Sequence, residues 1–167
     1  MSHQGTFTLL LTKQDFKFSC AHFIVFGAER AELLHGHNYQ VGVEIRGGSL
    51  SGEGLLIDLE RFKTRIRKAC ARLDNRTLIP SRSAHLAVEQ RAGGVEITFR
   101  DRRYRLPEGD VLILPEVNTS IEVLARVLWR ELAQALEEPA ATELGVNVSQ
   151  TSGQSCWYRA PLRRPAS

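Results

Sequence analysis

The chain has 167 residues, of which 43% are hydrophobic and 25% charged, enough for a single domain with a substantial core. This composition excludes a disordered tail, a collagen-like fibre and a coiled coil. The net charge is only +3, from 22 Lys and Arg against 19 Asp and Glu. Because the basic residues are scattered and the motifs of nucleic-acid-binding proteins are absent, we expect no nucleic-acid partner.

The cysteines and the apolar runs indicate a cellular compartment. The longest apolar runs are a handful of residues, so no segment is expected to span a membrane, and the N-terminal segment has no secretory signal pattern. The three cysteines, Cys20, Cys70 and Cys156, form no CxxC motif, and their odd number indicates reduced thiols. We therefore expect a cytoplasmic protein. No linker or repeat interrupts residues 1–167, which predicts one domain.

The first half of the chain predicts two strands and a helix. Residues 6–18 and 37–46 alternate apolar and polar side chains, as strands do. Asp58 is a suitable N-cap for a helix that runs to about Leu73. Its apolar side chains are spaced by three and four residues: Leu59, Phe62, Ile66, Ala69 and Leu73.

The second half predicts more strands around a second helix. Residues 84–114 resemble a β-meander, within an insert at about 80–115. Thr119 and Glu122 form a capping-box pattern before a helix. The apolar stripe of that helix is Ile121, Leu124, Leu128, Leu132 and Leu136. Two strand-like segments, ELGVNVSQT and SCWYRAP, close the chain. The order predicts an α+β fold with helices on one face of an antiparallel sheet.

Three of the five histidines have the spacing of a metal site. His35 and His37 lie at the start of a predicted strand, where residues i and i+2 project from the same face. His22 ends the preceding strand, and antiparallel pairing would bring it beside them. Three neutral imidazoles with an open fourth position are typical of catalytic zinc, so we predict a Zn²⁺ cofactor. The alternative is that these histidines are unrelated surface or core residues.

Five segments, in order, resemble the 6-pyruvoyl-tetrahydropterin synthase and 6-carboxy-tetrahydropterin synthase family. They are FSCAHF (18–23), HGHNY (35–39), LDN (73–75), NTSIEVLA (118–125) and SQTSGQSCWYR (149–159). The resemblance implies the tunnelling fold (T-fold), a four-stranded antiparallel sheet with two helices on one face. It also implies a homo-oligomeric barrel with sites between subunits, the metal ligands His22, His35 and His37, and a pterin substrate, 7,8-dihydroneopterin triphosphate.

The position of the family's catalytic cysteine differs in this chain. Four residues before His35, where the pyruvoyl- and carboxy-forming enzymes have a Cys base, the chain has Ala31. The next residue is Glu32, giving ExxHGH, which resembles the branch in which Glu replaces Cys. That branch cleaves the side chain by a retro-aldol step to 6-hydroxymethyl-7,8-dihydropterin. Glu32 is therefore the predicted base, Glu29 is the second candidate, and a solvated loop role for Glu32 is the alternative.

Two further family motifs are only partly kept. The resemblance makes Asp74 a catalytic residue, but Asn75 replaces the His that follows it; His85 of the insert is a spatial substitute or an exposed loop residue. Where the family's VxET motif uses Glu to hold the pterin ring, the chain has Gln150. An amide offers one acceptor and one donor group, so Gln150 would bind a pterin less tightly or suit another ring. Other candidate substrate contacts are Thr151 and Ser120.

These departures leave four functions open. The preferred one is zinc-dependent retro-aldol cleavage with Glu32 as the base. The others are 6-carboxy- or 6-pyruvoyl-tetrahydropterin synthesis with an altered relay, an altered-substrate enzyme of a specialised pathway, and a non-catalytic zinc-containing pterin or purine binder. Cys20, two residues before His22, is either close to the metal or a small hydrophobic core residue.

Overall fold

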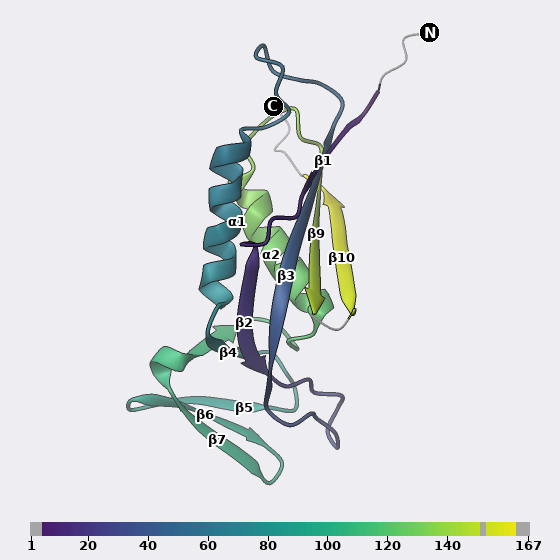
Figure 1. The fold of residues 1–167 in the computed structure, drawn as a ribbon. Coiled ribbons are helices and arrows are strands. Elements are labelled where there is room, and N and C mark those ends of the chain that lie inside the picture. The colour runs from purple at the N-terminus through teal and green to yellow at the C-terminus, as the bar shows by residue number, and fades with distance from the viewer. Residues whose placement is uncertain (1–4, 151–152, 163–167) are drawn as a thin grey trace.

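The computed structural model describes residues 5–150 and 153–162. Its main sheet has seven strands in the order β10-β9-β3-β2-β4-β8, with β1 also paired to β3 (Figure 1). These strands are β1 (Phe7–Leu11), β2 (Lys17–His22), β3 (His35–Gly47), β4 (Arg76–Pro80), β8 (Val111–Leu114), β9 (Glu143–Gln150) and β10 (Ser155–Pro161). Both helices lie on one face of this sheet, as predicted.

The long strand β3 is the centre of the sheet. Its alternation was predicted correctly, because Tyr39, Val41, Val43 and Ile45 are all 1% exposed or less and form part of the main core. β9 pairs with one edge of β3, and β1 and β2 pair with successive segments of the other, all antiparallel. The single strand predicted over 6–18 is therefore wrong. The chain turns between β1 and β2, where the Phe16 N–H donates to the Lys13 carbonyl.

The two helices have the predicted apolar stripes. α1 (Leu59–Leu73) begins after Asp58, whose carboxylate accepts a hydrogen bond from the Arg61 N–H at 3.0 Å. α2 (Ile121–Ala135) buries Leu124, Leu128 and Leu132 against the sheet. The capping box predicted from Thr119 is wrong, since the N-cap is Ser120.

Two parallel strands extend the predicted four-stranded sheet. β4 pairs parallel to β2, and β8 pairs parallel to β4. Residues 76–80 were not predicted as a strand, and residues 111–114 were assigned to the meander. Both segments are short and mostly apolar, a pattern that suits a strand buried in a parallel pair but does not identify its partner.

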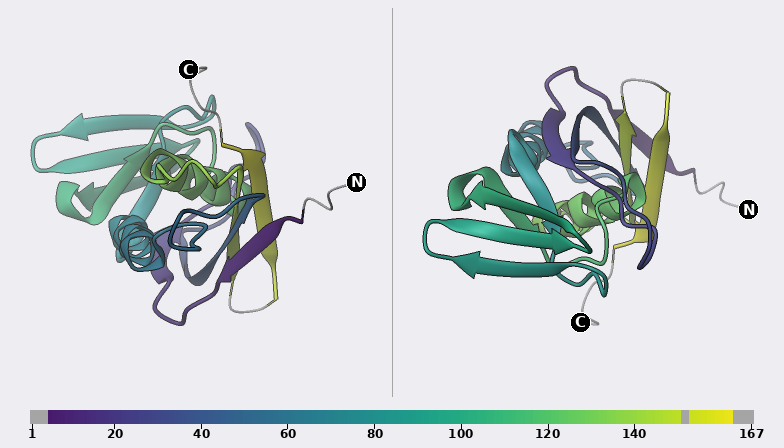
Figure 2. Two further views of the ribbon diagram at one scale, coloured as in Figure 1. Left: turned by 90° about the horizontal axis from the view of Figure 1, so that it is seen from above. Right: turned by 90° about the horizontal axis from the view of Figure 1, so that it is seen from below.

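The remaining insert forms a second, three-stranded sheet. Its strands are β5 (Ala87–Arg91), β6 (Gly94–Phe99) and β7 (Arg102–Pro107), and a short 3₁₀ turn, η1 (Glu108–Asp110), leads into β8. Figure 2 shows this sheet projecting to one side at the end of the main sheet where β2 ends and β3 begins. It has its own apolar cluster, which includes Phe23 and Val25 from the β2–β3 loop.

Gly47, at the end of β3, has no room for a side chain. A Cβ there would lie 2.0 Å from the Ala140 carbonyl oxygen and 2.6 Å from a Leu56 methyl carbon. Because backbone cannot move aside as a flexible side chain does, we expect Gly47→Ala to lower the free energy of unfolding by about 1–3 kcal/mol. The measurement is urea denaturation, with Gly48→Ala as the control, because the nearest atom to a Cβ there is 4.0 Å away. Equal stability of the two variants would contradict the clash.

Candidate active site

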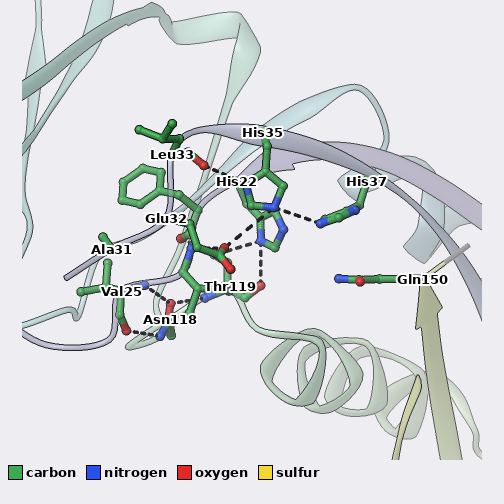
Figure 3. A network of polar contacts seen from close by, with 12 residues as sticks. His22, Val25, Ala31, Glu32, Leu33, His35, His37, Asn118, Thr119 and Gln150 are labelled. Carbon is green, nitrogen blue, oxygen red and sulfur yellow. Dashed lines mark hydrogen bonds and ion pairs between the residues drawn. The ribbon is translucent and has the colours of Figure 1, made fainter. Parts of the chain in front are cut away.

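The three histidines meet at the start of β3 (Figure 3). Antiparallel pairing places His22 directly opposite His35, and the strand period puts His37 on the same face. One ring nitrogen from each residue lies within 4.8 Å of the other two, and the Nε2 atoms of His35 and His37 are 2.9 Å apart. The predicted convergence is thus present in the structure.

Backbone carbonyls fix the orientation of two of the rings. His22 Nδ1 lies 3.0 Å from the Thr119 carbonyl oxygen, and His35 Nδ1 lies 2.7 Å from that of Leu33. A carbonyl only accepts, so both Nδ1 atoms carry hydrogen, and Nε2 is the nitrogen that presents a lone pair in the corresponding neutral tautomer. The hydroxyl of Thr119 donates to the Phe23 carbonyl at 3.3 Å, which explains why it does not cap α2.

Burial favours the neutral form of two of the imidazoles, His22 and His37. Burial lowers the pKa of His22 to about 4, and burial is also the main cause of the lowered pKa of His37. The Nε2 atoms of His35 and His37, 2.9 Å apart, face one another across a space that either a hydrogen bond or a shared cation can occupy. Three converging ring nitrogens, with two of the rings oriented by second-sphere carbonyls, suit a divalent transition-metal ion with a position left open.

Glu32 lies beside this cluster. Its Oε2 accepts a hydrogen bond from the Ile24 N–H at 3.0 Å and is 3.8 Å from His35 Nε2. Its own N–H donates to the Ile24 carbonyl at 2.9 Å, so the loop between β2 and β3 folds back on itself. The side chain is 36% exposed, which leaves it accessible to a substrate. Glu29, the second candidate, pairs with Arg100 instead and is 80% exposed.

Asp74 and Asn75 lie at the end of α1. Asp74 is its C-cap, and its carboxylate accepts hydrogen bonds from the Ser19 N–H at 2.7 Å and from the Asn75 side chain at 2.9 Å. Asn75 has φ 55°, a left-handed conformation that Asn tolerates better than most residues. Asp74 lines a cavity of about 730 Å³, whereas no histidine of the triad lines it. Asp74 is not part of the group of converging metal-binding side chains.

Gln150 is linked to the triad through Tyr39. Its Nε2 lies 3.4 Å from the Tyr39 hydroxyl, which is 3.1 Å from His22 Nε2. Burial raises the pKa of Tyr39 to about 12, so the phenol stays protonated. Gln150 and Tyr39 also line the cavity that contains Asp74. Tyr39 was missed as a site residue, although its place two residues after His37 on one strand was a usable signal.

The remaining predicted residues have other positions. Ser120 is the N-cap of α2, and its side-chain hydrogen bond is the main cause of the lowered pKa of Glu122. Thr151 lies outside the described residues. Cys20 is 4% exposed, belongs to the main core and is not part of the histidine group, as expected for a small core residue. His85 is in an exposed loop.

The fold and the site define an α+β protein with a three-histidine metal-binding geometry at one end of its sheet. Residues 11–161 match the family model described as 6-pyruvoyl tetrahydropterin synthase, and the chain belongs to this family. Its members are pterin-directed lyases, and the T-fold expected from the resemblance is confirmed. Within the described residues, no helix has the length and apolar character needed to cross a membrane.

Relatives and solved structures agree with this membership. A Methanocaldococcus jannaschii protein assigned as a 6-carboxy-5,6,7,8-tetrahydropterin synthase is 29% identical over 87% of the chain and 91% of its own length. A Halobacterium salinarum protein of the same assignment is 27% identical over 83% of the chain and 79% of its own length. The Plasmodium vivax 6-pyruvoyltetrahydropterin synthase structure has a TM-score of 0.88 at 29% identity, covering 94% and 99% of the two chains. Two variant structures of that enzyme replace a glutamate, described as its catalytic residue, by alanine or cysteine.

Proposed function

We propose that this protein is a zinc-dependent lyase that cleaves the side chain of 7,8-dihydroneopterin triphosphate, releasing 6-hydroxymethyl-7,8-dihydropterin. The observation that carries the proposal is the Glu32 carboxylate, 3.8 Å from a nitrogen of the three-histidine cluster. The catalytic glutamate of the Plasmodium vivax relative supports the same role for Glu32 here. A carboxylate one residue after the position of the family's thiol, which Ala31 occupies here, favours the Glu-for-Cys branch predicted from ExxHGH.

The proposed reaction is a retro-aldol cleavage. His22, His35 and His37 would hold the zinc ion, which when bound supplies Lewis acidity toward the side-chain oxygens. Glu32 accepts the proton of the hydroxyl on the second side-chain carbon. The bond between the first and second carbons breaks, and the second and third carbons leave together as a two-carbon aldehyde that bears the triphosphate on the third. The first carbon, conjugated with the ring, keeps the electron pair and takes up a proton, so atoms and charges balance.

The other residues of the proposed active site bind or orient the substrate. Gln150 and Tyr39 lie on the strands beside the cluster, where they can hydrogen-bond a pterin edge. Asp74 lines the same cavity as Gln150 and Tyr39, and its proposed role is at a site shared between subunits. We include a homo-oligomeric barrel and a cytoplasmic location in the proposal, and light scattering in solution tests the assembly.

Product identification separates this function from its competitors. The zinc-loaded protein is incubated with 7,8-dihydroneopterin triphosphate, and the pterins formed are identified by mass spectrometry. 6-Hydroxymethyl-7,8-dihydropterin supports the proposal. A 6-carboxy or 6-pyruvoyl product would replace the proposed function by that of the named relatives. Against this outcome, the chain has Ala31 at the position where that chemistry uses a thiol. Saturable pterin binding without turnover would indicate a binding protein. Neither binding nor turnover of this pterin would indicate an enzyme with an altered substrate.

Gln150→Glu tests whether the native ring is a pterin. A carboxylate accepts two N–H groups from the amino-pyrimidinone edge, and such charge-assisted bonds are about twice as strong as neutral ones. We expect this variant to bind a pterin roughly 5-fold more tightly, about 1 kcal/mol, by calorimetry. Gln90→Glu, on the exposed strand β5, is the control and should leave the affinity unchanged. Weaker pterin binding by Gln150→Glu would indicate that the amide recognises another ring.

A further inference from the structure

The inserted sheet packs against the loop that carries Glu32. Phe23 and Val25, from the start of this loop, are buried in one cluster with Val95, Ile97 and Phe99 of β6. The ring of Phe23 also lies 5.7 Å from that of Tyr104 on β7, centroid to centroid. The loop is thus covered on one side by strands that are far from it in the sequence.

Arg102, at the start of β7, makes the most specific contact with this loop. Its Nη1 donates to the Glu32 carbonyl oxygen at 2.7 Å, and its Nη2 donates to that of Ala31 at 3.1 Å. The guanidinium carbon is 4.9 Å from the centre of the Phe99 ring, so the insert's own core orients the side chain. A planar guanidinium with two hydrogen bonds restrains both peptide groups at once.

The opposite strand of the loop is fixed independently. Asn118 accepts from the Val25 N–H at 3.2 Å and donates to the Val25 carbonyl at 2.8 Å. Val25 in turn forms a β-bridge with Ala31. Arg102 therefore restrains the two peptide groups that flank the Cα of Glu32. Asn118 restrains Val25 on the other side of the loop. The remaining freedom of the carboxylate is limited by its bond from the Ile24 N–H.

We propose that Arg102 is a positioning residue, through which the insert holds the Glu32 carboxylate at its working distance from the histidine cluster. Because it takes Glu32 as the base, this role rests on the proposed function. The insert would thus serve the reaction without touching the substrate. A misplacement of about 1 Å at a reacting group can cost roughly 100-fold in rate, so loss of two backbone restraints has a measurable effect.

The first test compares Arg102→Gln with Arg103→Gln, a control on the exposed face of the same strand. We expect Arg102→Gln to lower kcat by about 10-fold or more, with KM and bound zinc unchanged, and Arg103→Gln to leave kcat unchanged. Arg102→Lys keeps the charge and can reach one carbonyl, so its loss should be smaller. If Arg102→Gln keeps the kcat of the control, the proposal is wrong.

A second readout does not depend on turnover. Hydrogen exchange of the Ile24, Phe26 and Glu32 amides, which are bonded within the loop, should accelerate in Arg102→Gln but not in Arg103→Gln. Unchanged exchange in Arg102→Gln would show that Arg102 does not restrain the loop, and would overturn the proposal even if kcat fell. Accelerated exchange across the whole main sheet would instead mean general destabilisation and would also overturn it.

Combining the substitutions shows whether Arg102 acts through Glu32. In a Glu32→Gln background, Arg102→Gln should cause no further loss of kcat, since residues that act as a unit are not additive. Full additivity would show that Arg102 acts by another route and would overturn the proposal. Failure of the proposed function gives a different result: either no 6-hydroxymethyl-7,8-dihydropterin forms, or Glu32→Gln alone keeps full turnover. In both cases the exchange rates still report whether Arg102 restrains the loop.

Discussion

Glu32→Gln is expected to lower kcat by about 10²–10⁴-fold, the usual contribution of a positioned general base. Glutamine has nearly the same shape and can still accept the hydrogen bond from the Ile24 N–H, so the loop should keep its conformation. What it loses is the ability to accept a proton from the substrate hydroxyl. The measurement is the steady-state rate of product formation, with bound zinc determined on the same sample.

The matched control for this prediction is Glu29→Gln. Glu29 belongs to the same loop, but it is 80% exposed and pairs with Arg100 rather than approaching the histidines. We expect this variant to retain nearly full turnover. Unchanged activity in Glu32→Gln, with zinc bound, would remove Glu32 from the chemistry. Loss of activity in Glu29→Gln alone would transfer the role to the second candidate.

His35→Ala is expected to weaken zinc binding by more than about 100-fold and to abolish turnover, because one of three ligands is lost. His35 is the informative choice because its side chain is 34% exposed. His22, by contrast, is 2% exposed and bonded to Thr119, so its replacement would also disturb the core. Metal content is measured by elemental analysis after dialysis against a defined free zinc concentration.

Thermal and chemical stability give a second readout of the same site. A ligand that binds only the folded state stabilises it by about 2.7 kcal/mol at a concentration 100 times its Kd. We expect zinc to raise the stability of the original protein by this amount and to leave His35→Ala nearly unchanged. His85→Ala, in an exposed loop, should respond to zinc like the original protein. A full zinc response in His35→Ala would contradict the three-histidine site.

Local patterns predicted the elements whose burial follows a simple period. The alternation from Tyr39 to Ile45 identified the central strand, and the spacing of apolar residues identified both helices. The same period explains why HGH could be interpreted as a pair of rings on one face. These predictions succeeded because side-chain direction in a strand or helix depends on the backbone conformation alone.

Long-range pairing could not be predicted in the same way. The short apolar segments that became β4 and β8 do not specify a parallel partner, and the meander gave no sign that Val111–Leu114 would leave it for the main sheet. Thr119 matched a capping pattern, but its hydroxyl bonds to the Phe23 carbonyl of a distant strand end. Such choices depend on which groups the folded chain brings together, and a tertiary contact overrides a local preference.

The sequence by itself determined the residue types at the candidate site: three imidazoles at strand positions, a glutamate three residues before the second of them, and an amide at position 150. Only the tertiary structure decided their geometry. It set His22 opposite His35, directed Glu32 toward the cluster and Glu29 away from it, and placed Arg102 against the loop from 70 residues further along the chain. The reason is physical, because the period of a strand fixes the face of a side chain, whereas the distance between two segments depends on the packing of the whole domain.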